Sequence, residues 1–445
     1  MLAALAVAVS VLKSPSFPIN DPALFEYFGR SILHGERLYG AELVDNKLPS
    51  IYLINALWQL LFGSNYFLHK CAAALVNLAS IALFALALRK LEVEAWALGS
   101  FLFAAFFSLP FPQLDYAQHY AVFFIVLGVF LGAFGRFAFA GVAISVATTF
   151  WLPAALTCVP MLLQPLERKQ RAMFLRGFLG TGAVLALVLG VFIGARALIG
   201  FLFVWKSYAW GINFPLARLE DTLFVSSLGS AILAMLALLL IVLRRPSTPT
   251  ARFALIWSAC MLAGFAIPPR FSEHYLLPST PALAMAIACY GVSFKDVLRR
   301  PILALAAVAL LAFAARNTIR QAIYDDSYAA YSQRMGHWIA ANLGPGAVIY
   351  TFEFVPEVLL AADGVGPGRS DPRAGPFAWG RMPDVLVFGP HEAPDSARRH
   401  FDITAQRDSA TITYVAVCPG RTGGLIIYAV SSKAGAFACR PKSSN

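Results

Sequence analysis

The sequence is poor in charged residues, and this scarcity excludes most classes of soluble protein. Of its 445 residues 13% are charged and 59% are hydrophobic, whereas a typical soluble domain has about 25% charged residues. Six cysteines do not make a disulfide scaffold at this length, and 32 glycines do not make a collagen-like repeat. The sequence has no Walker loop, no GxGxxG after a strand, no HExxH and no CxxC. ATP-driven transport and nucleotide-sugar binding by a soluble domain therefore have no support.

Apolar segments recur along most of the chain instead. A helix needs about 20 apolar residues to cross a bilayer core of about 30 Å, so these segments predict a mainly α-helical, polytopic membrane bundle. A short apolar segment at 1–12 is interpreted as a first span whose beginning is missing. The longer segments lie at 66–88, 94–109, 120–135, 177–197, 222–243, 253–268, 278–293 and 301–315.

The short loops that are rich in Lys and Arg predict the orientation, because such loops stay inside. The loops at 110–119, 198–221 and 269–277 and the tail after residue 316 then lie outside. The net charge of +11 thus reflects membrane topology, and no nucleic-acid partner is expected. Nine of the 13 acidic residues before residue 317 fall on the outer side, and carboxylates gathered at one mouth indicate a functional site there.

Residues 137–163 connect two basic loops, so a single crossing would place one of them outside. We therefore predict a re-entrant hairpin, in which Ala138–Thr149 enters the membrane and Leu152–Leu163 returns. Broken backbone at membrane depth is tolerated beside protein or a wet cavity, and we expect a cavity at this tip that opens to the outside.

Residues 13–65 form a long outer loop with the composition of an ordered segment. Apolar residues recur at helical spacing after Asn20-Asp21-Pro22, a sequence typical of an N-cap followed by proline in the first turn. A second amphipathic stretch, Pro49–Phe62, carries Tyr52 on its polar side. We expect two interfacial helices on the outer face of the membrane.

The chain is predicted to divide into a transmembrane domain at 1–316 and an extracytoplasmic α/β domain at 317–445. The second part is richer in charge and has a predicted helix at Tyr328–Asn342. Its β-branched and aromatic runs predict strands at Val348–Thr351, Asp384–Phe388, Thr411–Val417 and Gly424–Val430.

Two further features of the second part are interpreted from their residues. The Gly- and Pro-rich stretch Gly364–Gly380 is predicted to be a mobile loop over the mouth. Cys418 and Cys439 are the cysteines outside the apolar segments, and an oxidising compartment would allow them to form a disulfide.

The first outer loop resembles the opening of the GT-C glycosyltransferases, and in particular of protein O-mannosyltransferases and lipid A aminoarabinose transferases. A weaker similarity lies at Arg270–Pro278. The resemblance is carried by Asn20-Asp21-Pro22, Gly35-Glu36-Arg37-Leu38-Tyr39, Asp45-Asn46-Lys47-Leu48-Pro49-Ser50-Ile51-Tyr52 and Leu61-Phe62-Gly63. It departs at the re-entrant tip, where many relatives have a lysine and this chain has Thr149-Phe150-Trp151.

The resemblance implies a GT-C-like fold and a polyprenyl-phosphate-dependent, inverting glycosyltransferase. Its partners would be the polyprenyl-phosphate-sugar donor, membrane lipids and an outer-face acceptor that is a glycan, a lipid or a protein. Its location would be the bacterial inner membrane, with several spans and an extracytoplasmic C-terminal domain.

The chemistry needs a carboxylate that takes the proton of the acceptor and cations that hold the leaving phosphate. The resemblance places Asp21 as the general base and Lys47 on the phosphate. Asp45 would orient Lys47 or act on the acceptor, and Arg270 and His274 would join Lys47, since arginine binds two phosphate oxygens. The alternatives are an N-cap for Asp21, a headgroup contact for Lys47, a turn for Asp45, and caps of a helix end for Arg270 and His274.

Polar and aromatic residues of the outer loops are candidates for binding the acceptor or the sugar: Tyr52, Asp115, Tyr116, His119 and Tyr275. The alternative for such loop residues is simple solvation. The sequence shows no metal-ligand spacing, so no cofactor is predicted with certainty and a divalent cation stays open.

Two other functions fit parts of the pattern. A transporter or flippase of lipid-linked sugars would explain the hairpin and cavity, although transporters usually show internal repeats and none is found. A noncatalytic membrane assembly subunit would not require Asp21 and Lys47 together.

Overall fold

The computed structural model describes most of the membrane part and selected pieces of the tail. The described residues are 2–36, 38–39, 47–110, 113–194, 219–244, 246, 248–267, 271–292, 299–351, 356–364, 384–388, 414–416 and 426–430. Several predicted features lie outside these ranges: the site residues Asp45 and Arg270, the predicted disulfide between Cys418 and Cys439, and the loop at 365–380.

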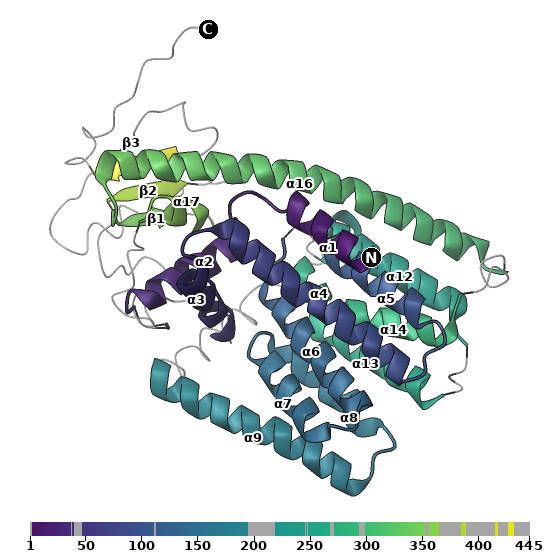
Figure 1. Cartoon of the computed structure of the whole chain (residues 1–445). Helices are drawn as coiled ribbons and strands as arrows, with labels where there is room; N and C mark the ends of the chain where they lie inside the picture. Colours follow the sequence, from purple (N-terminus) through teal and green to yellow (C-terminus); the bar gives the residue numbers. More distant parts are fainter. Residues whose placement is uncertain are drawn as a thin grey trace.

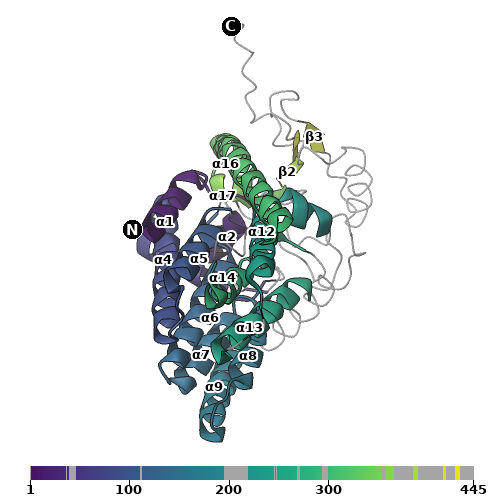
Figure 2. The same ribbon diagram turned by 90° about the vertical axis from the view of Figure 1, so that its right-hand side faces the viewer.

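A bundle of apolar helices forms the body of the molecule (Figures 1 and 2). Each predicted apolar segment contains a helix, which confirms the helical membrane architecture. By length and composition, α4, α9, α13 and α16 are each able to cross a membrane. The bundle consists of α1 (Leu2–Lys13), α4 (Tyr66–Lys90), α5 (Trp96–Ser108), α6 (Ala117–Ala133), α7 (Phe137–Thr148), α8 (Cys158–Leu163), α9 (Arg168–Ile193), α12 (Ser227–Val242), α13 (Pro249–Ala266), α14 (Ser279–Tyr290) and α16 (Pro301–Leu343).

Side-chain caps begin several of these helices, because the first backbone N–H groups of a helix lack intrahelical partners. Asn65 caps α4 by accepting from the N–H of Leu68, and Ser226 caps α12 by accepting from that of Gly229. At the start of α13, Thr248 accepts from Ala251 and Pro249 occupies the first turn.

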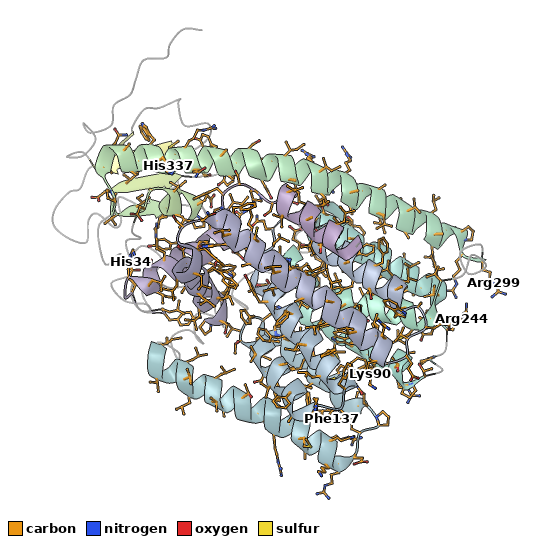
Figure 3. The ribbon with its side chains drawn as sticks, viewed as in Figure 1. His34, Lys90, Phe137, Arg244, Arg299 and His337 are labelled. Carbon is orange, nitrogen blue, oxygen red and sulfur yellow. The ribbon has the colours of Figure 1, made fainter. Side chains whose placement is uncertain are left out.

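Residues of the predicted inner loops and residues of the first outer loop and the tail lie at opposite ends of the bundle. Figure 3 shows Lys90, Arg244 and Arg299 at one end, and His34 and His337 at the other. The loops that the sequence assigns to the inside therefore gather on one side, away from the first outer loop and the tail.

The predicted hairpin at 137–163 is present as α7, the short 3-10 helix η1 (Leu152–Thr157) and α8. Its tip is packed, because Phe150 and Trp151 are buried and the Phe150 ring stacks on Tyr120 with 5.6 Å between centroids. The Ser50 hydroxyl donates to Thr149 Oγ1 at 2.7 Å, which joins the tip to the first outer loop. The cavity predicted beside the tip stays a prediction.

The first outer loop folds into α2 (Asn20–Leu33) and α3 (Ser50–Phe62), the two helices predicted there. They approach closely at Gly29, where a Cβ atom would lie 2.7 Å from the backbone nitrogen of Ala56. The N-cap predicted within Asn20-Asp21-Pro22, with Asp21 as the alternative named for it, lies one residue earlier. Ile19 occupies the cap without a side-chain bond, and Asn20 is the first helical residue, with a φ of 55°.

Helix α16 extends over 43 residues without a break. At 1.5 Å per residue it is about 65 Å long, roughly twice the thickness of a bilayer core. The predicted span at 301–315 and the predicted helix at 328–342 are thus one helix, and the predicted domain boundary at residue 316 falls inside it. The C-terminal half of α16 contacts the short helix α17 (Pro356–Ala361).

The four predicted strands are present as one sheet in the tail, which confirms its α/β character. The strands β1 (Ile349–Thr351), β2 (Val385–Phe388), β3 (Tyr414–Ala416) and β4 (Ile426–Val430) lie in the order β1-β2-β4-β3. Strands β1 and β2 are parallel, with Ile349 opposite Val385, and the other two pairs are antiparallel.

Candidate functional site

Asp21 and Lys47 form an ion pair near the N-terminal ends of α2 and α3. Asp21 lies in the first turn of α2, and Lys47 lies three residues before α3 begins. The Lys47 ammonium is 3.1 Å from Asp21 Oδ1, and the two side chains are 16% and 15% exposed. The Tyr39 hydroxyl donates to the backbone carbonyl of Lys47 and helps to fix this segment. The pair thus stays partly exposed, with Asp21 held by α2 and Lys47 held by a contact within the segment between α2 and α3.

His274 reaches the same carboxylate from a distant part of the chain. It lies in the short 3-10 helix η3 (Glu273–Leu276), and its Nε2 is 3.9 Å from Asp21 Oδ2. Its ring contacts Tyr116 and Tyr275, with centroids 4.8 and 4.6 Å away. Four predicted site residues, Asp21, Lys47, Tyr116 and His274, are therefore brought together, with Tyr275 beside them.

Tyr116 and Glu273 are the buried acids of this cluster. Burial and the charge of Asp21 raise the pKa of Tyr116 well above its usual value, so its hydroxyl keeps its proton. Burial, with a smaller contribution from Asp325, raises the pKa of Glu273 to about 7. Within the described part of the cluster, the Asp21 carboxylate, which pairs with the Lys47 ammonium, is therefore the candidate to accept a proton.

Tyr116 and three further predicted acceptor residues are buried rather than presented to a surface. Tyr52 is fully buried, with its ring against Phe25 and Phe28. His119 is 1% exposed and packs on Phe107. Asp115, 3% exposed, accepts a hydrogen bond from the Tyr66 hydroxyl at 3.2 Å. Such burial is typical of packing residues, and their role toward a substrate stays a prediction.

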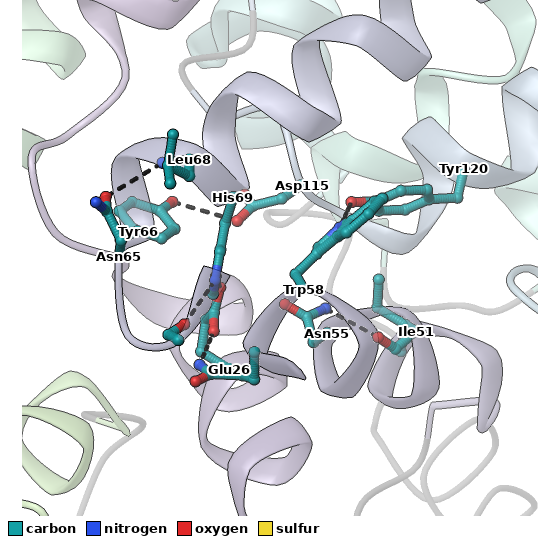
Figure 4. Close-up of polar contacts among 12 residues, drawn as sticks. Glu26, Ile51, Asn55, Trp58, Asn65, Tyr66, Leu68, His69, Asp115 and Tyr120 are labelled. Atoms are coloured by element: carbon teal, nitrogen blue, oxygen red, sulfur yellow. Dashed lines mark hydrogen bonds and ion pairs between the residues drawn. The ribbon is translucent and has the colours of Figure 1, made fainter. Parts of the chain in front are cut away.

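A second polar cluster, around Glu26 and His69, was not predicted from the sequence (Figure 4). Glu26 of α2 pairs with Nδ1 of His69 in α4 and accepts from the amide of Gln59 in α3. His69 Nε2 lies 2.9 Å from the carbonyl of Gly63. A carboxylate and a carbonyl both accept, so this arrangement fits an imidazolium that donates from both nitrogens.

Asp115 belongs electrostatically to this second cluster. Burial, followed by the charge of Glu26, raises the pKa of Asp115 to about 7. One sequence feature could have predicted this second cluster: His69 and Lys70 lie near the start of a mostly apolar span. Ionisable residues in a span usually have a specific partner.

The described residues contain no group of three or more His, Cys, Asp or Glu side chains arranged to hold a metal ion. The divalent cation therefore stays a prediction.

The sequence matches no family model and no curated protein, but the fold matches solved structures. ArnT from Cupriavidus metallidurans bound to undecaprenyl phosphate has a TM-score of 0.66 at 14% identity, covering 98% of each chain. The apo state of ArnT from that organism has a TM-score of 0.56 at 14% identity, covering 99% of this chain and 98% of the other. An Archaeoglobus fulgidus oligosaccharyltransferase in complex with Zn and sulfate has a TM-score of 0.54 at 12% identity, covering 96% and 73%. These proteins have the GT-C fold, so the predicted GT-C-like fold is confirmed. Sequence identities of 12% and 14% establish a shared fold and nothing about activity.

Proposed function

We propose that this chain is an integral membrane glycosyltransferase that transfers a sugar from a polyprenyl-phosphate donor to an acceptor on the extracytoplasmic face. The observation that carries the proposal is the contact of Asp21 with Lys47 at 3.1 Å, with His274 on the other carboxylate oxygen. A proton acceptor and a phosphate-binding cation are the two groups that the reaction needs side by side.

The fold supports a lipid-linked donor. ArnT has been solved with undecaprenyl phosphate, and this chain is more similar to that form than to the apo form, with TM-scores of 0.66 and 0.56. Helix α3 also exposes an apolar stripe next to the site, at Leu53, Leu57, Leu60 and Leu61. Exposed leucines at this helical spacing suit contact with lipid chains at the membrane interface.

The reaction is a single displacement at the anomeric carbon. The acceptor hydroxyl or amine attacks that carbon and gives its proton to the Asp21 carboxylate. The bond between the carbon and the phosphate oxygen breaks, its electron pair goes to the polyprenyl phosphate, and Lys47 stabilises the added charge. One displacement inverts the configuration of the sugar. Arg270 is proposed as a second phosphate ligand, and Asp45 as a residue that orients Lys47 or contacts the acceptor.

The test is sugar transfer by the purified chain in vesicles that contain a radiolabelled polyprenyl-phosphate sugar and a panel of outer-face acceptors. The Asp21→Asn variant is expected to lose roughly 10²–10⁴-fold in rate, the usual contribution of a general base. Asp221→Asn, at an exposed acid of the outer side, is the matched control and should keep the parent rate. Full transfer by an inserted Asp21→Asn variant would reject the assignment, and transfer with and without a chelator decides the divalent cation.

The extracytoplasmic location is tested separately with a reporter. Ser327 is exposed on the outer half of α16, so a cysteine at this position should react with an impermeant reagent in intact cells. Labelling that requires permeabilised cells would overturn the proposed orientation.

A further inference from the structure

Glu357 of the tail is a buried carboxylate that contacts the start of the site helix. It lies in α17, and its side chain is fully buried. Its Oε2 accepts a hydrogen bond from the backbone N–H of Asn20 at 3.2 Å, across 337 residues of sequence. This contact joins the outer domain to the residue that directly precedes Asp21.

The backbone at Asn20 is in a conformation that needs support. Its φ of 55° is in the left-handed region, which asparagine adopts more easily than most residues but still at some cost. One peptide bond separates this residue from Asp21, so a change in the Asn20 backbone reorients the Asp21 carboxylate. The 3.1 Å contact of that carboxylate with Lys47 therefore depends on the conformation of Asn20.

Helix α17 is held firmly enough to serve as a support. On one side it meets α16 at Gly336, where a Cβ atom would lie 2.5 Å from that of Ala361. On the other side Arg30, near the end of α2, forms an ion pair with Asp363 at 2.7 Å. The same guanidinium lies 3.4 Å from the carbonyls of Leu360 and Gly364. Two contacts, at Glu357 and at Asp363, thus join the outer domain to the two ends of α2.

We propose that Glu357 is a positioning residue, which fixes the Asn20 backbone so that the Asp21 carboxylate meets Lys47 and the acceptor. The role of Asp21 in this inference rests on the proposed function. A buried carboxylate is expensive to desolvate, and an apolar residue of similar volume often gives a more stable protein. Stability alone therefore does not account for a polar side chain here, whereas its hydrogen bonds to the Asn20 N–H and the Tyr328 side chain do.

The first experiment measures the Asp21–Lys47 contact without any activity. Lys47 is acetylated under limiting reagent in the purified full chain, and the extent is read by mass spectrometry. Glu357→Met keeps the volume and removes the acceptor, so we expect acetylation of Lys47 to rise several-fold toward that of Asp21→Asn. Glu357→Gln keeps a carbonyl oxygen and should give the parent value. Asp363→Asn removes the charge from the other contact of α17 and should also leave Lys47 unchanged.

The second experiment measures transfer. Glu357→Met is expected to lower kcat at least tenfold with the donor KM unchanged, and Glu357→Gln to retain more than half of the parent kcat. If Glu357→Met does not fold, Glu357→Asp, which withdraws the acceptor by one methylene, takes its place with a smaller loss expected. Parent-like Lys47 acetylation in a folded Glu357→Met or Glu357→Asp protein would overturn the inference, as would equal effects in Asp363→Asn. If the parent chain transfers no sugar, the proposed function fails and the acetylation result still decides the positioning role.

Discussion

The carboxylate of Glu26 and the imidazole of His69 form an ion pair in the interior, and each side chain is only 2% exposed (Figure 4). The pair links α2 to α4, and the Gln59 amide adds α3 to the same carboxylate. Buried pairs of this kind are poor sources of net stability, but they penalise any arrangement that separates the partners. Glu26 and His69 therefore help to fix the position of α2 and α3 relative to α4.

Removal of one partner should be far more harmful than removal of both. His69→Leu leaves the Glu26 carboxylate buried without its counterion, which typically costs about 3–5 kcal/mol. Glu26→Leu combined with His69→Leu should recover most of that loss. His34→Leu, at an exposed histidine, is the control. Thermal midpoints in detergent measure the effect, and equal midpoints for His69→Leu and the parent would contradict the buried pair.

The elements of the fold were predictable where the signal is local. Apolar runs predicted the bundle helices, and the residues around Asp21 and Lys47 predicted a site where the structure shows a contact. The continuity of α16 could also have been predicted, because no Pro or Gly interrupts 302–335.

The missed features depend on contacts between distant residues. Glu26 and His69 are 43 positions apart, and Asn20 and Glu357 are 337 apart. Neither pair leaves a periodic pattern or a turn motif in the sequence. The misplaced N-cap has the same origin, since a local rule favoured a side-chain cap within Asn20-Asp21-Pro22, whereas α2 starts after Ile19 and the Asn20 N–H is bound by Glu357 of the tail.

Lys47 and Asp21 should affect different kinetic constants. Lys47→Ala is expected to raise the donor KM roughly 10- to 100-fold, because a charge-assisted contact to phosphate contributes on the order of 1.5–3 kcal/mol. Asp21→Asn should lower kcat with little change in donor KM. Because the two side chains touch, the loss in the double variant should be smaller than the product of the single losses. Independent, multiplicative losses would show that the pair does not act as a unit.

His274 can be tested for its contact with Asp21 separately from its packing. His274→Phe keeps a ring against Tyr116 but removes Nε2, whereas His274→Ala removes both. If His274 orients Asp21, both variants should lose about tenfold in kcat, and His274→Ala should also lose thermal stability. If it binds phosphate instead, the donor KM should rise in both. Parent kinetics in His274→Phe would leave only the packing role.

Gly29→Ala should separate α2 from α3. The added Cβ would lie 2.7 Å from the backbone nitrogen of Ala56 and 2.8 Å from the backbone carbon of Asn55, and neither can rotate away. Overpacking of this kind costs about 1–3 kcal/mol, and the shift would also lengthen the Asp21–Lys47 contact. Gly180→Ala is the matched control, because nothing lies within 4 Å of its Cβ in α9, and it should stabilise by up to about 1 kcal/mol. Equal thermal midpoints for the two variants would contradict this close approach.

Stability should fall as pH rises from about 5 to 8. Burial raises the pKa of Asp115, Glu273 and Glu357 each to about 7, whereas in the unfolded chain these carboxyls ionise near 4. Between these values the folded protein keeps protons that the unfolded chain has lost. Each raised pKa therefore contributes a loss that begins near pH 4 and is complete at about pH 8, on the order of 4 kcal/mol per carboxyl.

The amide variants isolate each contribution, because an amide keeps the acceptor oxygen and cannot ionise. In Glu357→Gln the thermal midpoint in detergent should fall less between pH 5 and pH 8 than in the parent, and Glu273→Gln should remove a further share. Asp363→Asn, at an exposed carboxyl, should keep the parent slope. A midpoint that rises with pH in the parent would contradict the summed effect of the three carboxyls. An unchanged slope in Glu357→Gln would mean that this carboxyl is already ionised in the folded protein at pH 5, and that its bond to the Asn20 N–H stabilises the charged form more than burial penalises it.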